Sequence, residues 1–311
     1  MASRKLEERL DHLRQLKGAT ADPSVVSILR KSLTDRSNLI VTEAAKVTAH
    51  LNIVSLIPDL LSAFDRLFED PVKTDPKCWG KMAIVTALTQ LDYSESAPFL
   101  RGCRHVQMEP VWGGQEDAAA QLRASCYLAL VQCNDLTRFE VFRHLVDALA
   151  DTADPVRIEG VRALGQLAGD DSILLLRLKA RAGDRRPLIT GHVFDALLSL
   201  ERDPAVSFVG DYLRSNDHEI RDEAALALGA SRLEAAINLL IKEWNESSGR
   251  EFRAVLLRAL SSSRQQRAID FLLNLVKSAP QHDVAAALEA LKLHENSPEI
   301  QALIDEAKRR F

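Results

Sequence analysis

The sequence predicts an all-α solenoid of paired helices, and three observations support this prediction. Apolar residues recur every three or four positions along most of the chain, as on one face of an amphipathic helix. One sequence pattern returns at a nearly constant interval, which is typical of repeat proteins. Strand signals are nearly absent, because there is no Asn-Gly or Asp-Gly turn and no alternating β-branched run between turns. We therefore expect a predominantly helical chain with no sheet.

The repeat is clearest in three segments: VRIEGVRALGQL from Val156, IRDEAALALGA from Ile220, and FRAVLLRALSS from Phe252. Each has an apolar residue followed by arginine, and Ala-Leu begins seven residues after that apolar residue. Alignment on that alanine gives the anchors Ala49, Ala87, Ala129, Ala163, Ala196, Ala227, Ala259 and Ala290. Small anchors let paired helices approach closely, so we expect Ala163, Ala227 and Ala259 to be buried at helix contacts.

The anchors predict about eight helical hairpins in a single domain, residues 1–311. No helix of this kind buries its apolar face alone, so neighbouring pairs must stack. In the clearest repeat, residues 137–150 form the first helix, and Asp154-Pro155 open the second as cap and first turn. The predicted parts are an N-terminal helix at 1–18, irregular repeats at 23–116, regular repeats at 117–293 and a capping helix at 297–311.

Two segments carry a family resemblance. DPVRIEGVRALGQLAGDDS (154–172) closely resembles the HEAT-like repeat of phycobilin lyase subunits, and DHEIRDEAALALGASRLEAAINLL (217–240) resembles it again. The likeness is strong over 117–293 and weaker over 23–104, and it is that of a bacterial-type member. It implies a right-handed α-α superhelix whose second helices line the concave side. It implies a fold and no single activity, because proteins with such repeats have many unrelated functions.

Composition and motifs narrow the function further. The net charge of −4 lacks the basic excess of a dedicated nucleic-acid binder, so nucleic acid is a disfavoured partner. No apolar run reaches the roughly 18 residues of a membrane span, and the charged N-terminal segment does not resemble a secretion signal. Cys78, Cys103, Cys126 and Cys133 fit no zinc spacing. We expect a cytoplasmic protein with buried thiols, no metal, no cofactor and no membrane partner.

Enzymatic alternatives have weak support in the residues. The sequence has no GxxxxGK[ST], GxGxxG, GxSxG or HExxH motif. His218-Glu219 and His294-Glu295 resemble the His-Glu pairs that bind di-iron in deoxyhypusine hydroxylase, a HEAT-type protein, but there are two pairs where that family has four. An alkylation-repair DNA glycosylase would need an aromatic, basic cleft with a carboxylate, for which Trp112 and Asp117 are the candidates. A bilin lyase-like protein is implied only by the name of the repeat.

Two long loops are the first candidate site. EDPVKTDPKCWGK (69–81) and RHVQMEPVWGGQED (104–117) interrupt the repeat and join the first helix to the second in consecutive hairpins. We expect them side by side on one edge, where they bind a partner through Lys73, Lys77, Trp79, Arg104, His105, Glu109, Trp112 and Gln115. The alternative is that Trp112 plugs the edge of the solenoid while Pro110 and Gly113-Gly114 shape the turn.

A basic column is the second candidate site. Six residues before each anchor stand Glu43, Lys81, Arg123, Arg157, Thr190, Arg221, Arg253 and Val284, of which five are basic. The column of Lys81, Arg123, Arg157, Arg221 and Arg253 either lines a concave groove for an acidic or phosphorylated peptide or pairs with aspartates at helix starts, such as Asp117, Asp154 and Asp217. We predict a non-enzymatic scaffold or adaptor that binds another protein or an acidic peptide. The alternative is a HEAT-fold enzyme such as the glycosylase or the bilin lyase-like protein.

Overall fold

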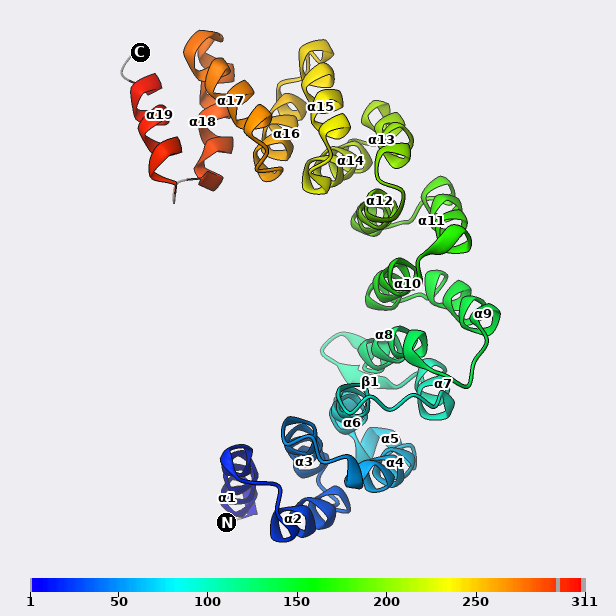
Figure 1. The fold of residues 1–311 in the computed structure, drawn as a ribbon. Helices are drawn as coiled ribbons and strands as arrows, with labels where there is room; N and C mark the ends of the chain where they lie inside the picture. Colours follow the sequence, from blue (N-terminus) through cyan, green and yellow to red (C-terminus); the bar gives the residue numbers. More distant parts are fainter. Residues whose placement is uncertain (1, 295–296, 309–311) are drawn as a thin grey trace. The chain divides into compact units, whose positions relative to one another are not determined.

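The computed structural model describes residues 2–294 and 297–308, and the chain divides into two compact units, Met1–Ala163 and Leu164–Phe311. Each unit is a stack of helical hairpins, with successive helices running back and forth (Figure 1). The all-α solenoid class predicted from the repeat is confirmed, because helices make up nearly all of the secondary structure in the described residues.

The helices and strands of the first unit have the following bounds. They are α1 Ala2–Gln15, α2 Pro23–Leu33, α3 Asn38–His50, α4 Ile57–Arg66, α5 Pro71–Thr74, α6 Trp79–Gln90, α7 Ala97–Cys103, β1 Met108–Val111, β2 Gly114–Asp117, α8 Ala120–Ala129 and α9 Arg138–Leu149. Short 3-10 helices lie at Leu16–Gly18, Val54–Leu56, Pro76–Cys78 and Leu130–Gln132. Helix α10, Asp154–Leu167, contains the boundary between the units.

The second unit continues the same alternation of helices. Its helices are α11 Gly169–Ala182, α12 Pro187–Glu201, α13 Asp203–Gly210, α14 His218–Ser231, α15 Glu234–Glu246, α16 Arg250–Ser262, α17 Gln266–Ser278, α18 Gln281–Leu291 and α19 Pro298–Lys308, with 3-10 helices at Asp211–Arg214 and Lys292–His294. Helix α19 packs against α17 at the C-terminal end of the stack, where a capping helix was predicted. Residues 309–311 of that predicted helix lie outside the described residues.

Each hairpin packs its first helix against its second, and the second helices of successive hairpins stack on one another. In the first unit α3, α6 and α8 form such a row, and in the second unit α12, α14, α16 and α18 form another. All eight anchor alanines lie on second helices. Ala163, Ala227 and Ala259 are buried, as predicted from their small size and position. The repeat pattern in the sequence therefore reports the contacts between stacked second helices.

Helix starts are fixed by the caps that the sequence offers. Asp22 accepts hydrogen bonds from the backbone N–H groups of Ser24 and Val25 at the start of α2. Thr137 and Glu140 form a reciprocal capping box at the start of α9. Such caps satisfy backbone donors that have no partner within the helix, and each stabilises the helix by about 1 kcal/mol.

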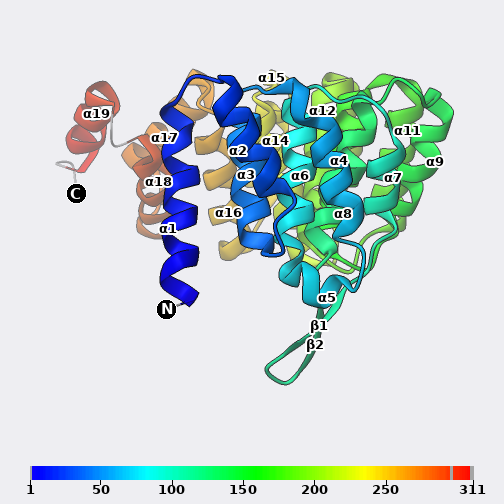
Figure 2. The same ribbon diagram turned by 90° about the horizontal axis from the view of Figure 1, so that it is seen from below.

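The prediction that the chain has no sheet is wrong in one place. Strands β1 and β2 pair antiparallel, with Met108 opposite Asp117 and Val111 opposite Gly114, and this hairpin projects away from the helices (Figure 2). Its turn consists of Trp112 and Gly113, and Gly113 adopts φ of 90°, a conformation that suits glycine. Gly113 thus shapes the turn, in a segment that the sequence predicted to be an irregular loop.

Gly229 in α14 gives a direct test of how closely the second helices stack. A Cβ atom there would lie 2.1 Å from the backbone oxygen of Ala259 in α16, and a helix backbone cannot move aside as a side chain can. Gly229→Ala should therefore lower the free energy of unfolding by about 1–3 kcal/mol despite the better helix propensity of alanine, as measured by urea denaturation.

Gly165 provides the matched control. A Cβ atom at this position would lie 3.9 Å from the Ala196 side chain, which is an ordinary contact. Gly165→Ala should leave stability unchanged or raise it by up to about 1 kcal/mol, because alanine is the better helix former. Equal denaturation midpoints for the two variants would contradict this account of the stacking.

Candidate functional site

Asp75 is the buried centre of the first long loop. Its carboxylate accepts hydrogen bonds from the backbone N–H groups of Gly80 and Lys81 at 2.7 and 2.9 Å, and from Asn38 Nδ2 at 3.0 Å. The Lys81 Nζ lies 3.1 Å from the same carboxylate, and both side chains are fully buried. A Cβ atom at Gly80 would lie 3.1 Å from this carboxylate and 2.7 Å from Leu67, so glycine leaves room for the cap. The carboxylate thus caps α6 and neutralises Lys81.

Gln107 joins the second long loop to the first. Its Nε2 donates hydrogen bonds to the Asp75 carbonyl at 2.9 Å and to Glu109 Oε1 at 2.6 Å. Its Oε1 lies 3.0 Å from His105 Nε2 and 3.1 Å from the Cys78 thiol. The Glu109 carboxylate also accepts a hydrogen bond from the Lys77 backbone N–H at 2.6 Å. These contacts confirm that the two loops lie side by side at one edge of the first unit.

Gln107 was not among the residues selected from the sequence, although its neighbours were. The signal that could have found it is weak, because glutamine in a loop is usually solvated. Its role depends on the fold around it: it is buried, and its side-chain amide binds both Asp75 and Cys78 in the other loop and His105 and Glu109 in its own.

Arg123 fixes the other side of the hairpin base. Its guanidinium donates two hydrogen bonds of 3.0 Å to Asp151, one of 3.0 Å to the His105 carbonyl and one to Asp117 at the end of β2. Burial alone would raise the pKa of Asp117, but hydrogen bonds from the Gln107 backbone and Arg123 outweigh it and hold that pKa below its usual value. The base of the hairpin is therefore held by buried, charge-assisted bonds.

The tip of the hairpin is open to solvent in the described structure. Trp112 has an exposed fraction of 103%, and Val111 and Met108 are also exposed. Trp112 therefore does not plug the solenoid edge, which was the alternative role considered for it. Trp112 lies in the turn of the hairpin and Asp117 at its base, where Arg123 pairs with the Asp117 carboxylate, so these two residues do not form an aromatic pocket with a free carboxylate.

The remaining loop residues fall into different surroundings. Lys73 is exposed and pairs with Asp70. The Lys77 Nζ lies 5.3 Å from the centre of the half-exposed Trp79 ring. Gln115 is exposed on β2. His105 is partly buried against the edge of Phe68, and burial lowers its pKa. Arg104 is separate from this group, because it lines a pocket between α7 and α9. The structure thus gathers the hairpin, Lys77 and Glu109 and leaves Arg104 elsewhere.

The basic column is largely built into the fold. Lys81, Arg123 and Arg157 are buried, and Arg157 donates to Asp154 at 2.7 Å and to the Asp151 carbonyl at 2.8 Å. In the second unit, Arg253 lies 3.0 Å from Asp283 and stacks 3.8 Å from the centre of the Trp244 ring. Arg221 stacks over Phe252 at 4.1 Å. Lys81, Arg123, Arg157 and Arg253 thus pair with aspartates inside each unit, as the structural alternative for the column required, whereas Arg221 contacts the Phe252 ring and His218.

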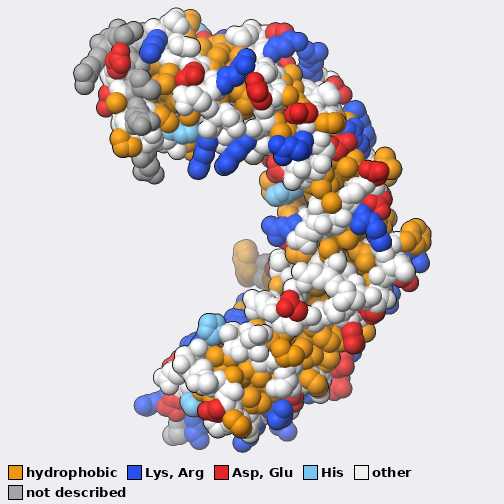
Figure 3. Space-filling view, viewed as in Figure 1, with side chains coloured by type: hydrophobic (Ala, Val, Ile, Leu, Met, Phe, Trp, Pro, Cys, Tyr) orange, Lys and Arg blue, Asp and Glu red, His pale blue; other side chains and the backbone are white. Residues whose placement is uncertain are grey.

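Exposed charge is mixed rather than segregated. Lys and Arg side chains are interspersed with Asp and Glu side chains over the visible surface (Figure 3). Within residues 2–294 and 297–308, every helix is too short or too polar to span a lipid bilayer. In the same part of the chain, no three His, Cys, Asp or Glu side chains are grouped as a metal site would require.

The two His-Glu pairs are engaged in structural contacts. The His218 ring lies 2.9 Å from the Arg221 guanidinium, and the His294 ring lies 3.0 Å from the Ser261 carbonyl. Glu295, the second member of the latter pair, lies outside the described residues.

Comparisons with known proteins agree with the repeat architecture. Residues 206–292 match the family model of HEAT repeats. Among solved structures, human deoxyhypusine hydroxylase in complex with glycerol is similar at 20% sequence identity, covering 83% of this chain and 90% of that chain, with a TM-score of 0.31. The search of curated proteins found no match.

Asp75 offers a test of what positions the loops. Asp75→Asn keeps the size of the side chain but leaves the buried Lys81 charge uncompensated, so it should cost about 3–5 kcal/mol of unfolding free energy. Asp70→Asn, which removes an exposed partner of Lys73, should cost no more than about 1 kcal/mol. Urea denaturation of both variants provides the comparison, and similar losses would show that the buried pair does not organise this edge.

Proposed function

We propose that this protein is a non-enzymatic scaffold that binds another protein through the hairpin surface, which we define as Lys77, Met108, Val111, Trp112, Gln115 and Glu116. The HEAT-type architecture suits a scaffold, because stacked helical hairpins form a rigid support on which loops present binding residues. A partner protein or an acidic peptide is the class of ligand that this surface suits.

The exposure of Trp112 is the observation that carries the proposal. Tryptophan has a large apolar surface, and complete exposure leaves that surface in water with no benefit to the fold. Tryptophan is also among the residue types most enriched at binding hot spots. The turn itself requires glycine only at Gly113, so nothing in the hairpin geometry requires an aromatic residue at its neighbour.

Firm attachment of the hairpin base supports the same role. An isolated two-stranded hairpin is at best marginally stable in water, so an exposed one needs anchoring. Gln107, Glu109 and Arg123 provide it through hydrogen bonds to the neighbouring loop and within the hairpin base. A tip held on a rigid base loses less conformational entropy on binding than a mobile loop does.

Lys77 offers one contact for an acidic group of the partner. Lys77 is exposed. It lies next to the hairpin base, because its backbone N–H donates a hydrogen bond to Glu109. Its ammonium group and the half-exposed Trp79 ring together present a cationic and an aromatic contact. Glu116 adds one negative charge on β2, so the attraction is local and does not extend over the whole hairpin.

Partner capture from native lysate, compared between variants, tests this proposal. Trp112→Ala should leave the melting temperature within about 1 °C of wild type, since surface changes alter stability by no more than about 0.5 kcal/mol. It should reduce recovery of the captured partner at least tenfold, as expected for a hot-spot loss of about 1.4 kcal/mol or more.

Phe139→Ala is the matched control, because Phe139 is an aromatic residue of the same unit that is 72% exposed on α9. It should keep both stability and partner recovery. Equal recovery with Trp112→Ala and wild type would refute binding through the hairpin tip, and equal losses in the two variants would indicate non-specific capture by exposed aromatic residues.

A further inference from the structure

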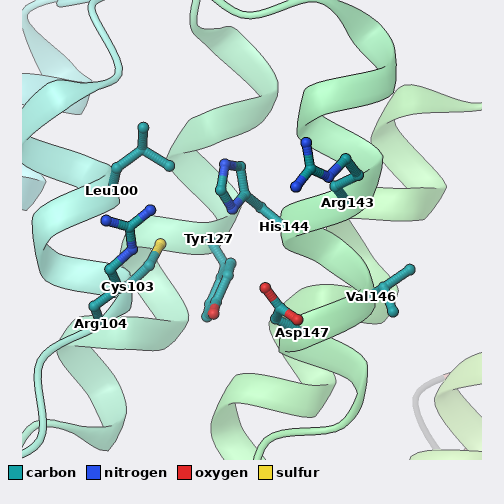
Figure 4. A pocket seen from close by; sticks show the side chains of 8 residues that line it. All are labelled: Leu100, Cys103, Arg104, Tyr127, Arg143, His144, Val146 and Asp147. Atoms are coloured by element: carbon teal, nitrogen blue, oxygen red, sulfur yellow. The ribbon is translucent and has the colours of Figure 1, made fainter.

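A pocket of about 370 Å³ lies between α7 and α9 in the first unit (Figure 4). Three other pairs of first helices pack directly on one another: α2 on α4, α13 on α15 and α15 on α17. Here the space between two first helices is open, with Cys103 and Arg104 at the end of α7 on one side and Arg143, His144 and Asp147 of α9 on the other. The volume falls within the range of pockets that bind small ligands.

Two arginines of this pocket differ from those of the basic column. Arg104 and Arg143 are both exposed, and neither forms an ion pair or a hydrogen bond within the described part of the chain. The nearby Glu140 does not neutralise Arg143 directly, because its carboxylate is held by the Thr137 backbone N–H and hydroxyl at 2.8 and 2.7 Å. Two guanidinium groups thus face the pocket with their donors free for a ligand.

Tyr127 supplies a third donor from the floor of the pocket. Its side chain comes from α8 and is only 6% exposed, yet its hydroxyl has no hydrogen-bond partner among the described residues. Burial, followed by the nearby Cys103 and Asp147, raises the pKa of Tyr127. The hydroxyl therefore stays protonated at neutral pH and can donate a hydrogen bond.

We propose that this pocket binds a phosphate monoester carried on a small apolar group. Arginine guanidinium groups match phosphate oxygens with paired, charge-assisted hydrogen bonds, and Arg104 and Arg143 provide such groups from opposite walls. His144 lies between them in Figure 4 and can add a further donor. Leu100 and Val146 give the pocket apolar walls for the body of the ligand.

Asp147 should weaken phosphate binding, and the direction of this effect can be tested. Its carboxylate lies on the side of the pocket toward the Tyr127 hydroxyl, one helical turn beyond Arg143 on α9. It repels a bound phosphate, so the ligand should place its phosphate near the two arginines and an uncharged part near Asp147. Asp147→Asn should therefore tighten phosphate binding, while removal of either arginine should weaken it.

Isothermal titration calorimetry with phenyl phosphate at neutral pH and low ionic strength tests the site. Wild-type protein should bind this probe, and Arg104→Gln and Arg143→Gln should each weaken binding at least tenfold, as expected for a lost charge-assisted contact. Tyr127→Phe should weaken it severalfold and Asp147→Asn should tighten it severalfold. Arg250→Gln, which removes an exposed arginine on α16, should leave affinity unchanged and controls for net charge.

Three outcomes would overturn the proposal: no binding of phenyl phosphate up to about 10 mM, equal losses in Arg250→Gln and the pocket variants, or weaker binding in Asp147→Asn. Thermal melts of each variant show whether the fold is intact, and the opposite signs expected for Asp147 and Arg143 cannot both arise from partial unfolding.

The source of the phosphate is distinguished by two further probes, inorganic phosphate and a phosphotyrosine pentapeptide. Tighter binding of the peptide than of phenyl phosphate would assign the ligand to a modified side chain of a partner. Tighter binding of phenyl phosphate would assign it to a free small molecule. Trp112→Ala should bind phenyl phosphate as wild type does, so this site and the hairpin surface can fail independently.

Discussion

The pairing of buried charges at the starts of second helices is the interaction on which this structure most depends. Lys81 with Asp75, Arg123 with Asp117 and Asp151, and Arg253 with Asp283 all occupy one position of the repeat. A buried charge is costly unless its partner is in place, so each pair helps to fix the position of the segment that carries the aspartate. The first repeat keeps this arrangement with the charges reversed, because Glu43 replaces the basic residue and pairs with Lys17 at 3.0 Å. Thr190 and Val284 stand at the same position without a charge, so the position accepts a neutral pair or an uncharged side chain and does not require a basic column.

The same ladder of charges holds the candidate binding surface. Hydrogen bonds to Asp75 hold the first long loop, and hydrogen bonds to Arg123 hold the second. Gln107 joins the two loops, and the donors and acceptor of its side-chain amide are all used within the protein. The polar groups at the hairpin base form hydrogen bonds within the protein, whereas the apolar tip is exposed to solvent. This division is opposite to that of an ordinary surface loop, whose polar groups face water. It explains how a two-stranded hairpin can project from a helical protein without support along its length.

Sequence patterns predicted the helices well because the constraints that set them are local. Anchor alanines at a fixed interval report close helix packing, and Asp154-Pro155 or Thr137 with Glu140 report helix starts. The same patterns could not tell whether the basic column faces solvent or aspartates, since that depends on loop conformations such as the positive φ of Lys77 and Cys78. The hairpin was missed because its turn, Trp112-Gly113, lacks the usual two-residue signature and Pro110 argues against a strand. No pattern in the sequence singles out Gln107 or Tyr127. Gln107 is important because it binds Asp75 and Cys78, which are distant in the sequence, and Tyr127 because its hydroxyl forms no hydrogen bond with the described residues.

Both proposed surfaces lie where the repeat is least regular, and one physical cause accounts for this. A regular hairpin uses its helix faces to bury neighbours and its short loops to close the turn, so few side chains are left over for a ligand. The extra residues between Arg66 and Trp79, and between Cys103 and Ala120, satisfy their own backbone through Asp75, Gln107 and Asp117 and leave Trp112 outside. The second of these insertions begins at Arg104, directly after the seven-residue helix α7. The chain turns away at that point toward the hairpin, and Arg104 and the floor residue Tyr127 face α9 across the pocket. One insertion in the repeat therefore lies beside both proposed sites, the apolar tip proposed to bind a protein and the cationic pocket proposed to bind a phosphate.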